Sequence, residues 1–108
     1  MSSLAGFQRT YLRGLAHPLR PAVRVGKEGV TEPVLATIDE ALEARELIKV
    51  SLPGTRLERR ELAAAIAERS AAECIGLLGG IAIFFRPCAD PDRRRILPPV
   101  RPAPTQAL

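Results

Sequence analysis

Apolar residues recur along this chain at two spacings, which predict where helices and strands lie. Three segments carry apolar residues three or four positions apart, the repeat of a helix with one buried face. Shorter runs rich in β-branched and aromatic residues are typical of strands. We expect a first helix of about a dozen residues that ends at Pro18, further helices from Thr31 and over Arg56–Arg69, and strands over 22–25, 47–52, 74–78 and 81–85.

The same spacing predicts which helix residues point into a core. Thr31 suits the N-cap of the second helix because its hydroxyl can accept an N–H of the first turn, and Pro33 is tolerated there. The outer face of this helix is acidic, with Asp39, Glu40 and Glu43. The residues expected to face inward are Leu4, Phe7, Tyr11 and Leu15 in the first helix, Val34, Leu35, Ile38 and Leu42 in the second, and Leu57, Leu62 and Ile66 in the third.

The order of these elements, α-β-α-β-α-β-β, predicts an α/β (α+β) domain. Strands separated by a helix are expected to pair in parallel, because the helix returns the chain to the same end of the sheet. Gly79-Gly80 leaves two residues between the last two strands, which suits a tight antiparallel hairpin. The sequence therefore predicts a four-stranded mixed sheet.

The composition changes after Arg86. Residues 87–108 hold six of the ten prolines and the run Arg93-Arg94-Arg95. Such a segment cannot build a packed core of its own. A chain of 108 residues has room for one domain. We expect one domain over residues 1–87 and a flexible Pro/Arg-rich tail over residues 88–108.

Basic residues outnumber acidic ones by 16 to 12, which gives a net charge of +4. This excess favours an anionic partner, nucleic acid first and a membrane surface second. Fourteen of the 16 basic residues are arginine, so the codon bias of a GC-rich genome is an alternative explanation. No apolar run reaches the roughly 18 residues of a membrane span, and no signal-peptide pattern begins the chain. The expectation is a cytoplasmic monomer without a membrane partner.

The segment with the clearest binding chemistry is Gly26-Lys27-Glu28-Gly29, between a predicted strand and a predicted helix. Glycines let the backbone turn sharply and approach a ligand, and the N-terminus of a helix suits phosphate. Lys27 adds a mobile positive charge, and Glu28 can point away into solvent. A strand–GxxG–helix unit is typical of a clamp for a nucleic-acid backbone. The alternative is an ordinary turn in which the glycines only supply unusual φ angles.

Other basic residues could extend a binding surface around this loop. Lys49 alternates with Ile48 and Val50 along a strand, so it should face the other side of the sheet. For each of these residues the alternative is an ordinary solvated or structural side chain. The candidate nucleic-acid-binding residues are Gly26, Lys27, Glu28, Gly29, Arg13, Arg20, Arg24, Lys49 and Arg86.

Arg56, Arg59 and Arg60 form a second group of cations at the start of the third helix. The positive end of the helix dipole disfavours cations there unless an anion is near. Glu58 and Glu61 are interleaved with them and are available to pair with them. The group is therefore left out of the candidate site.

Five further segments carry a resemblance to a known family, in matching order and spacing. They are residues 12–21 (LRGLAHPLRP), 41–50 (ALEARELIKV), 62–68 (LAAAIAE), 74–79 (CIGLLG) and 83–86 (IFFR). Together with the GxxG loop they resemble the CRM domain, named for chloroplast RNA splicing and ribosome maturation. The form that the chain looks most like is the small stand-alone bacterial, YhbY-like one, over roughly residues 4–87.

This resemblance implies a fold, a partner and a function for the chain. It implies a fold similar to the C-terminal domain of bacterial translation initiation factor three. It also implies RNA as the partner and a role in ribosome maturation on large-subunit precursors, with no catalysis and no cofactor. Arg86 matches the closing Arg of the family. The chain departs from the family at Arg45, where His commonly precedes Glu46, so the charge is kept and any role of an imidazole is lost.

Other classes of function stay open at this point. A protein-interaction adaptor would use the acidic face of the second helix and residues 87–108, and its binding would survive nuclease. A small DNA-binding regulator would prefer duplex DNA and would form a symmetric dimer. An enzyme would need chemistry from Cys74, Cys88 or His17, which form neither a metal-ligand pattern nor a supported nucleophile.

Overall fold

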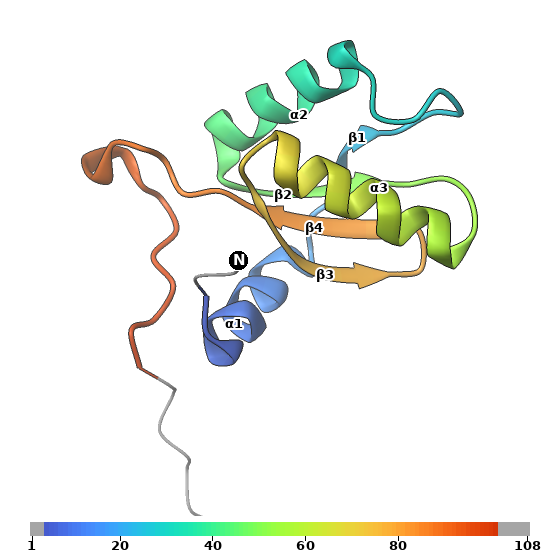
Figure 1. Ribbon diagram of the computed structural model, residues 1–108. Coiled ribbons are helices and arrows are strands. Elements are labelled where there is room, and N and C mark those ends of the chain that lie inside the picture. Colours follow the sequence, from blue (N-terminus) through green and yellow to red (C-terminus); the bar gives the residue numbers. More distant parts are fainter. Residues whose placement is uncertain (1–3, 102–108) are drawn as a thin grey trace, which may run out of the picture.

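Three helices and four strands follow one another in the order expected from the sequence. The computed structural model describes residues 4–101. The elements are α1 Gly6–Ala16, β1 Pro21–Arg24, α2 Glu32–Arg45, β2 Leu47–Ser51, α3 Arg56–Arg69, β3 Glu73–Leu78 and β4 Ile81–Phe85, with a short 3-10 turn over Pro91–Arg93 (Figure 1). The predicted α+β order is confirmed.

The strands form one mixed sheet in the order β1-β2-β4-β3. β1 and β2 pair in parallel, and β4 pairs antiparallel with both β2 and β3. The predicted mixed sheet is thus confirmed. These directions bring three connections to one end of the sheet, on the right in Figure 1: the loop after β1, the loop after β2 and the β3–β4 hairpin. We call this the loop end of the domain.

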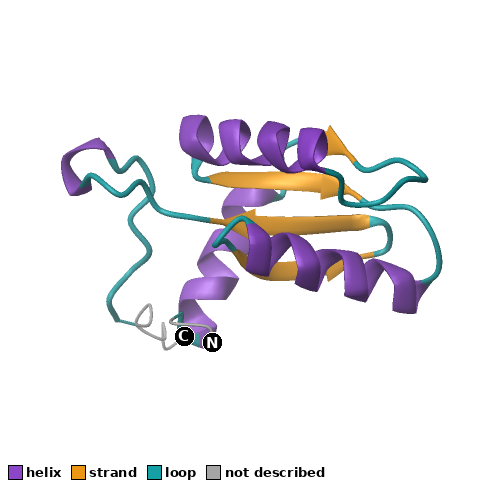
Figure 2. Ribbon diagram, turned by 45° about the horizontal axis from the view of Figure 1, so that its top comes forward, coloured by secondary structure: helices purple, strands orange, loops and turns teal. Residues whose placement is uncertain are grey.

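Helices cover both faces of the sheet (Figure 2). Successive β2 residues, Leu47 and Ile48, enter opposite cores, as the period of a strand requires. Lys49 therefore shares a face with Leu47 and lies opposite Ile48, as predicted. On the face of α2 and α3 the main core includes Ile38, Leu42, Ile48, Val50, Ile66 and Phe84. On the other face α1 closes a smaller core with Leu12, Ala16, Leu47, Ile75, Ile83 and Phe85.

The buried face of α1 differs from the prediction. Leu12 and Ala16 are fully buried, whereas Tyr11 is 43% and Leu15 is 39% exposed. The helix carries two apolar rows side by side, each with a four-residue repeat that puts its members on one face. Spacing along the sequence cannot choose between adjacent rows. The choice follows from packing on the sheet, where Leu12 and Ala16 share the smaller core with Leu47.

Leu57 is a second departure, because the sequence predicts it in the core and it is 66% exposed. It lies in the first turn of α3, which extends past the end of the sheet (Figure 1). At this end of α3 the residues beside the β3–β4 hairpin are arginines, among them Arg59, and Leu57 is not among the residues packed against the described cores. Leu62 and Ile66, further along the helix, do pack against the main core.

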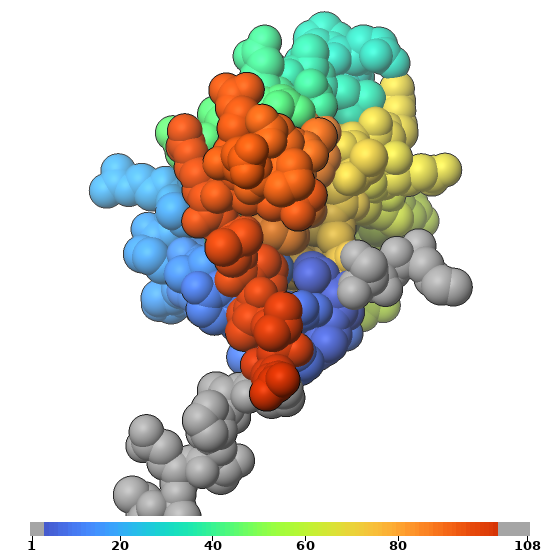
Figure 3. All heavy atoms as spheres, turned by 90° about the vertical axis from the view of Figure 1, so that its left-hand side faces the viewer, coloured from blue at the N-terminus to red at the C-terminus, as the bar shows by residue number. Residues whose placement is uncertain are grey.

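The chain after β4 turns back over the domain and lies across the side shown in Figure 3. Ile96 packs against the smaller core. The Arg95 guanidinium donates to the carbonyl of Ala44 at 2.9 Å, and the Gln8 side-chain amide donates to the carbonyl of Pro99 at 3.1 Å. The flexibility expected of residues 88–108 stays a prediction, and residues 102–108 lie outside the described range.

Candidate functional site

The Gly26–Gly29 segment is a hydrogen-bonded turn at the loop end. The N–H of Gly29 donates to the carbonyl of Gly26 at 3.0 Å, and the N–H of Thr31 donates to the carbonyl of Gly29 at 3.1 Å. Lys27 and Glu28 occupy the two central positions and are both exposed. The turn therefore presents one cation and one anion at its tip.

The two glycines have different structural roles. Gly29 has φ +78, a backbone conformation that side chains rarely adopt, and a Cβ added there would lie 3.8 Å from Leu62 of α3. A Cβ added at Gly26 would meet nothing within 4 Å. The fold thus requires a glycine at position 29, whereas position 26 has open space next to it.

Some backbone amides of this turn are uncommitted. Within residues 4–101, the N–H groups of Lys27 and Glu28 make no hydrogen bond to the protein. The N-terminus of α2 offers less than the sequence suggests, because Pro33 has no N–H and the N–H of Val34 donates to the Thr31 hydroxyl at 3.4 Å. Successive free amides in a turn form an anion-binding concavity. The turn itself therefore supplies two successive free donors.

The loop end gathers further cations around this turn. Arg24 ends β1 and is exposed. Arg56, Arg59 and Arg60 begin α3 at the same end. In open α/β sheets ligands bind beyond the carboxyl ends of the parallel strands, and here the parallel pair β1 and β2 ends at this side. The sequence signal for the arginines of α3 is their spacing of three and four residues, which puts them on one helix face.

The structure does not bring Arg13 to the turn. Its guanidinium donates to the carbonyl of Ile75 at 3.1 Å and to the hydroxyl of Thr10 at 3.2 Å. Ile75 belongs to β3, which is three strands away from β1. At the usual spacing of strands that is a separation of about 14 Å. Arg13 supports the β3 edge in this structure.

Two other candidates have partners inside the protein. The Lys49 ammonium donates to the carbonyl of His17 at 3.1 Å and so ties β2 to the end of α1. The Arg86 side chain is 17% exposed and donates to Asp39 Oδ1 at 2.7 Å and to the carbonyl of Ser70 at 2.8 Å. Both roles are structural, and contact of either residue with nucleic acid stays a prediction.

Arg20 and Arg24 differ from Arg13, Lys49 and Arg86, whose side chains bond within the protein. Both are exposed, and within the described residues neither side chain makes a hydrogen bond or an ion pair. Arg20 lies between α1 and β1, and Arg24 ends β1 two residues before the turn. Their charges are therefore free to act on an external anion.

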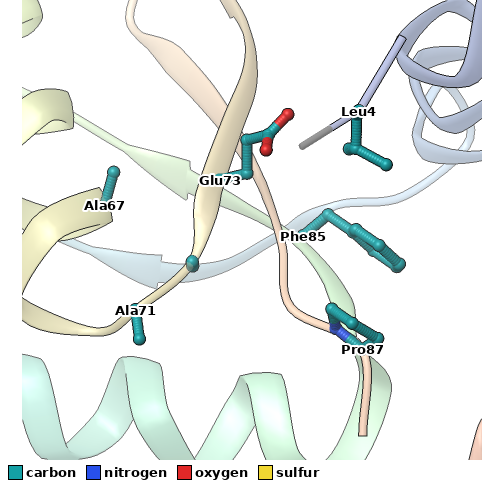
Figure 4. A pocket seen from close by; sticks show the side chains of 7 residues that line it. Leu4, Ala67, Ala71, Glu73, Phe85 and Pro87 are labelled. Carbon is teal, nitrogen blue, oxygen red and sulfur yellow. The ribbon is translucent and has the colours of Figure 1, made fainter. Parts of the chain in front are cut away.

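A cavity of about 340 Å³ near the start of β3 has the wrong chemistry for such a ligand (Figure 4). Its carboxylate, Glu73, lies 4.0 Å from the Arg9 guanidinium. The other lining side chains are apolar: Leu4, Ala67, Ala71, Ala72, Phe85 and Pro87. The described lining of this cavity therefore offers an anion no positive charge.

The Cys74 thiol offers little reactivity. Burial raises the pKa of the Cys74 thiol, against the smaller effect of hydrogen bonds with the backbone of Gly76 and Ile83. A raised pKa leaves less of the nucleophilic thiolate at neutral pH.

Among residues 4–101, no helix has the length and apolar character needed to cross a membrane.

The fold and the turn define a small α+β domain with a GxxG turn between its first parallel strand and the following helix. The chain belongs to the CRS1 / YhbY (CRM) domain family, whose model matches residues 4–86. The resemblance seen in the sequence is thereby confirmed.

Individual relatives cover most of the chain. It is 41% identical over 88 residues to an RNA-binding protein of Haemophilus influenzae, which covers 81% of this chain and 89% of the relative. It is 38% identical over 84 residues to the Bacillus subtilis "Probable RNA-binding protein YqeI", and the match covers 77% of this chain and 88% of the relative. The solution structure of the hypothetical protein SAV1595 from Staphylococcus aureus matches with a TM-score of 0.75 at 33% identity, over 87% of this chain and 99% of that one.

Proposed function

We propose that this protein binds RNA through the Gly26–Gly29 turn and assists ribosome maturation, without catalysis and as a cytoplasmic monomer. The proposed RNA is ribosomal RNA in a precursor of the large subunit. The observation that carries the proposal is an exposed turn with two uncommitted amides and a lysine, at the end of the sheet where further cations gather. RNA as the partner is supported by the names of the two relatives above.

In this proposal a backbone phosphate occupies the open space beside Gly26. It accepts hydrogen bonds from the N–H groups of Lys27 and Glu28, and the Lys27 ammonium adds a charge-assisted contact. The fold does not need a glycine at position 26, where an added Cβ would meet nothing. A glycine at position 26, which has no Cβ, would let a ligand approach the backbone closely. Gly29 acts indirectly, because its positive φ shapes the turn.

The adaptor hypothesis receives less support, because Arg86 pairs with the acidic face of α2 and the C-terminal segment lies beside that face. Asp39 and Glu43 of the acidic α2 face both accept from Arg86, at 2.7 Å and 3.2 Å. A groove on the same face is also lined by Arg93 and Arg95 of the C-terminal segment. Much of the acidic charge is thus balanced within the chain.

Sedimentation of the tagged protein from a bacterial lysate tests the proposal. On a sucrose gradient we expect it to migrate with free large subunits or their precursors, and to leave them after RNase treatment or at high salt. The folded Gly26→Asp variant should stay at the top, because it puts bulk and negative charge where the phosphate would lie. Wild-type protein at the top of every gradient would contradict the ribosomal role. Undiminished migration of Gly26→Asp would contradict the role of the turn.

A further inference from the structure

A groove of about 310 Å³ lies at the loop end, between the first turns of α3 and the β3–β4 hairpin. Three of its lining residues are Arg56, Arg59 and Arg60, and the others are Leu77, Leu78 and Gly79. The groove therefore has positive charge on one wall and apolar side chains on the other. Among the described residues, no carboxylate lines it.

The three arginines have no internal counter-charge. None of them takes part in an ion pair or a side-chain hydrogen bond among residues 4–101. Glu58, which lies between them in sequence, is committed elsewhere: its carboxylate accepts the Thr55 N–H at 3.1 Å and completes the N-terminal cap of α3. Like charges close together near the positive end of a helix repel one another and the dipole. The arrangement is therefore unfavourable without an external anion.

The Arg59 side chain is held in position by the β3–β4 hairpin at Gly80. A Cβ added at Gly80 would lie 3.7 Å from both Nε and Cζ of Arg59, so the guanidinium packs against the hairpin backbone. Its Nε is buried and has no hydrogen-bond partner in the described part of the chain. Leaving a charged donor unpaired costs free energy. The fold thus fixes one guanidinium beside the groove in advance, with Arg56 and Arg60 exposed next to it.

We propose that this groove is a second phosphate site, which binds a backbone phosphate of the same RNA that contacts the Gly26–Gly29 turn. The inference rests on the proposed function above. A guanidinium matches phosphate with paired N–H donors, which favours arginine over lysine for this contact. The ligand is thereby specified as a nucleic-acid strand that crosses the loop end.

The turn and the groove are close enough to share one strand. Leu62, which would touch a Cβ at Gly29, lies on α3 with the arginines. It is three residues after Arg59, or about 4.5 Å along the helix axis. A short stretch of RNA can therefore reach both places.

The test compares two double variants that remove the same charge. Arg56→Gln/Arg60→Gln removes the two exposed positive charges of the groove and leaves Arg59 and its packing intact. Arg93→Gln/Arg101→Gln removes two exposed arginines of the C-terminal segment and is the control. Binding of purified large-subunit ribosomal RNA is measured by filter retention over a series of KCl concentrations. Thermal unfolding checks that both double variants are folded. If Arg56→Gln/Arg60→Gln does not fold, the single Arg60→Gln variant replaces it in the binding measurement.

For the groove variant we expect affinity about tenfold weaker than that of the control. We also expect a smaller slope of log affinity against log salt, by about 0.7–0.9 for each phosphate that the variant no longer neutralises. An affinity and a slope equal to those of the control pair would overturn the second site. If Gly26→Asp still weakens binding in that case, the proposed function stands and only this inference fails. Absence of binding by the wild-type protein would overturn both.

Discussion

The Glu46 carboxylate oxygen Oε1 lies 2.6 Å from the backbone nitrogen of Arg95, and this hydrogen bond joins the end of α2 to the C-terminal segment. The carboxylate also accepts from the backbone N–H groups of Cys88 at 2.7 Å and Ile96 at 3.1 Å. Glu46 is 2% exposed, and its φ of 65 lies in the left-handed region. A buried carboxylate is costly unless hydrogen-bonded. The three amides of the C-terminal segment satisfy it.

We predict that Glu46→Gln loosens the C-terminal segment. Glutamine has the same shape but one acceptor oxygen fewer, and its NH2 group would face backbone N–H donors. The expected loss in free energy of unfolding is about 1–3 kcal/mol, measured by urea denaturation. Amide hydrogen exchange at Arg95 and Ile96 should become faster. Glu40→Gln, an exposed change on the same helix, is the control, and equal exchange in the two variants would contradict the role of Glu46.

Acid should release the same segment. Burial acts to raise the pKa of Glu46, but the hydrogen bonds from Cys88, Arg95 and Ile96, with the charge of Arg94, outweigh it and hold the pKa below its ordinary value of 4.5. A carboxyl group whose folded pKa is lowered stabilises the folded state above its ordinary pKa and loses that effect as the pH falls through the folded value. We expect the stability difference between wild type and Glu46→Gln to be constant near neutral pH. Below the ordinary pKa of 4.5 this difference in stability should shrink, and urea unfolding at neutral and at acidic pH would show this. A difference that is the same at both pH values would contradict the assignment.

Substitutions at the two glycines of the turn should separate folding from binding. Gly26→Ala is expected to leave the melting temperature nearly unchanged, because the added Cβ meets nothing, and to weaken RNA binding several-fold. Gly29→Ala places a side chain at φ +78 and should destabilise the protein by about 1 kcal/mol. Thermal unfolding and filter binding measure the two effects. Full RNA affinity in the Gly26→Ala protein would show that no ligand approaches this position closely.

The parts of the molecule that sequence predicted well depend on local signals. The elements follow from apolar spacing, and the turn at Gly26–Gly29 follows from its glycines and the helix cap at Thr31. The placement of Arg13 could not be predicted, because its partner Ile75 is 62 residues away in sequence. The contact between Glu46 and the C-terminal segment is similarly distant, and nothing in a proline-rich composition indicates it.

Arg13 illustrates how a basic residue near a binding loop in sequence can serve the fold instead. Ile75 lies where the register between β3 and β4 shifts, and its carbonyl accepts from Arg13 at 3.1 Å. A Cβ at the neighbouring Gly76 would come within 3.2 Å of the Arg13 side chain, so a glycine there lets the arginine lie across the strand. Both residues thus contribute to one contact on the β3 edge.

We therefore predict that Arg13→Ala lowers the free energy of unfolding by about 1 kcal/mol, the usual contribution of one hydrogen bond. Its effect on RNA affinity should be no larger than that of Arg93→Ala, which removes the same charge at an exposed position. Gly76→Ala should reproduce part of the loss in stability, because it displaces the Arg13 side chain without changing the charge. Urea unfolding and filter binding distinguish these effects. A larger loss of affinity for Arg13→Ala than for Arg93→Ala, at unchanged stability, would instead assign Arg13 to the RNA-binding surface.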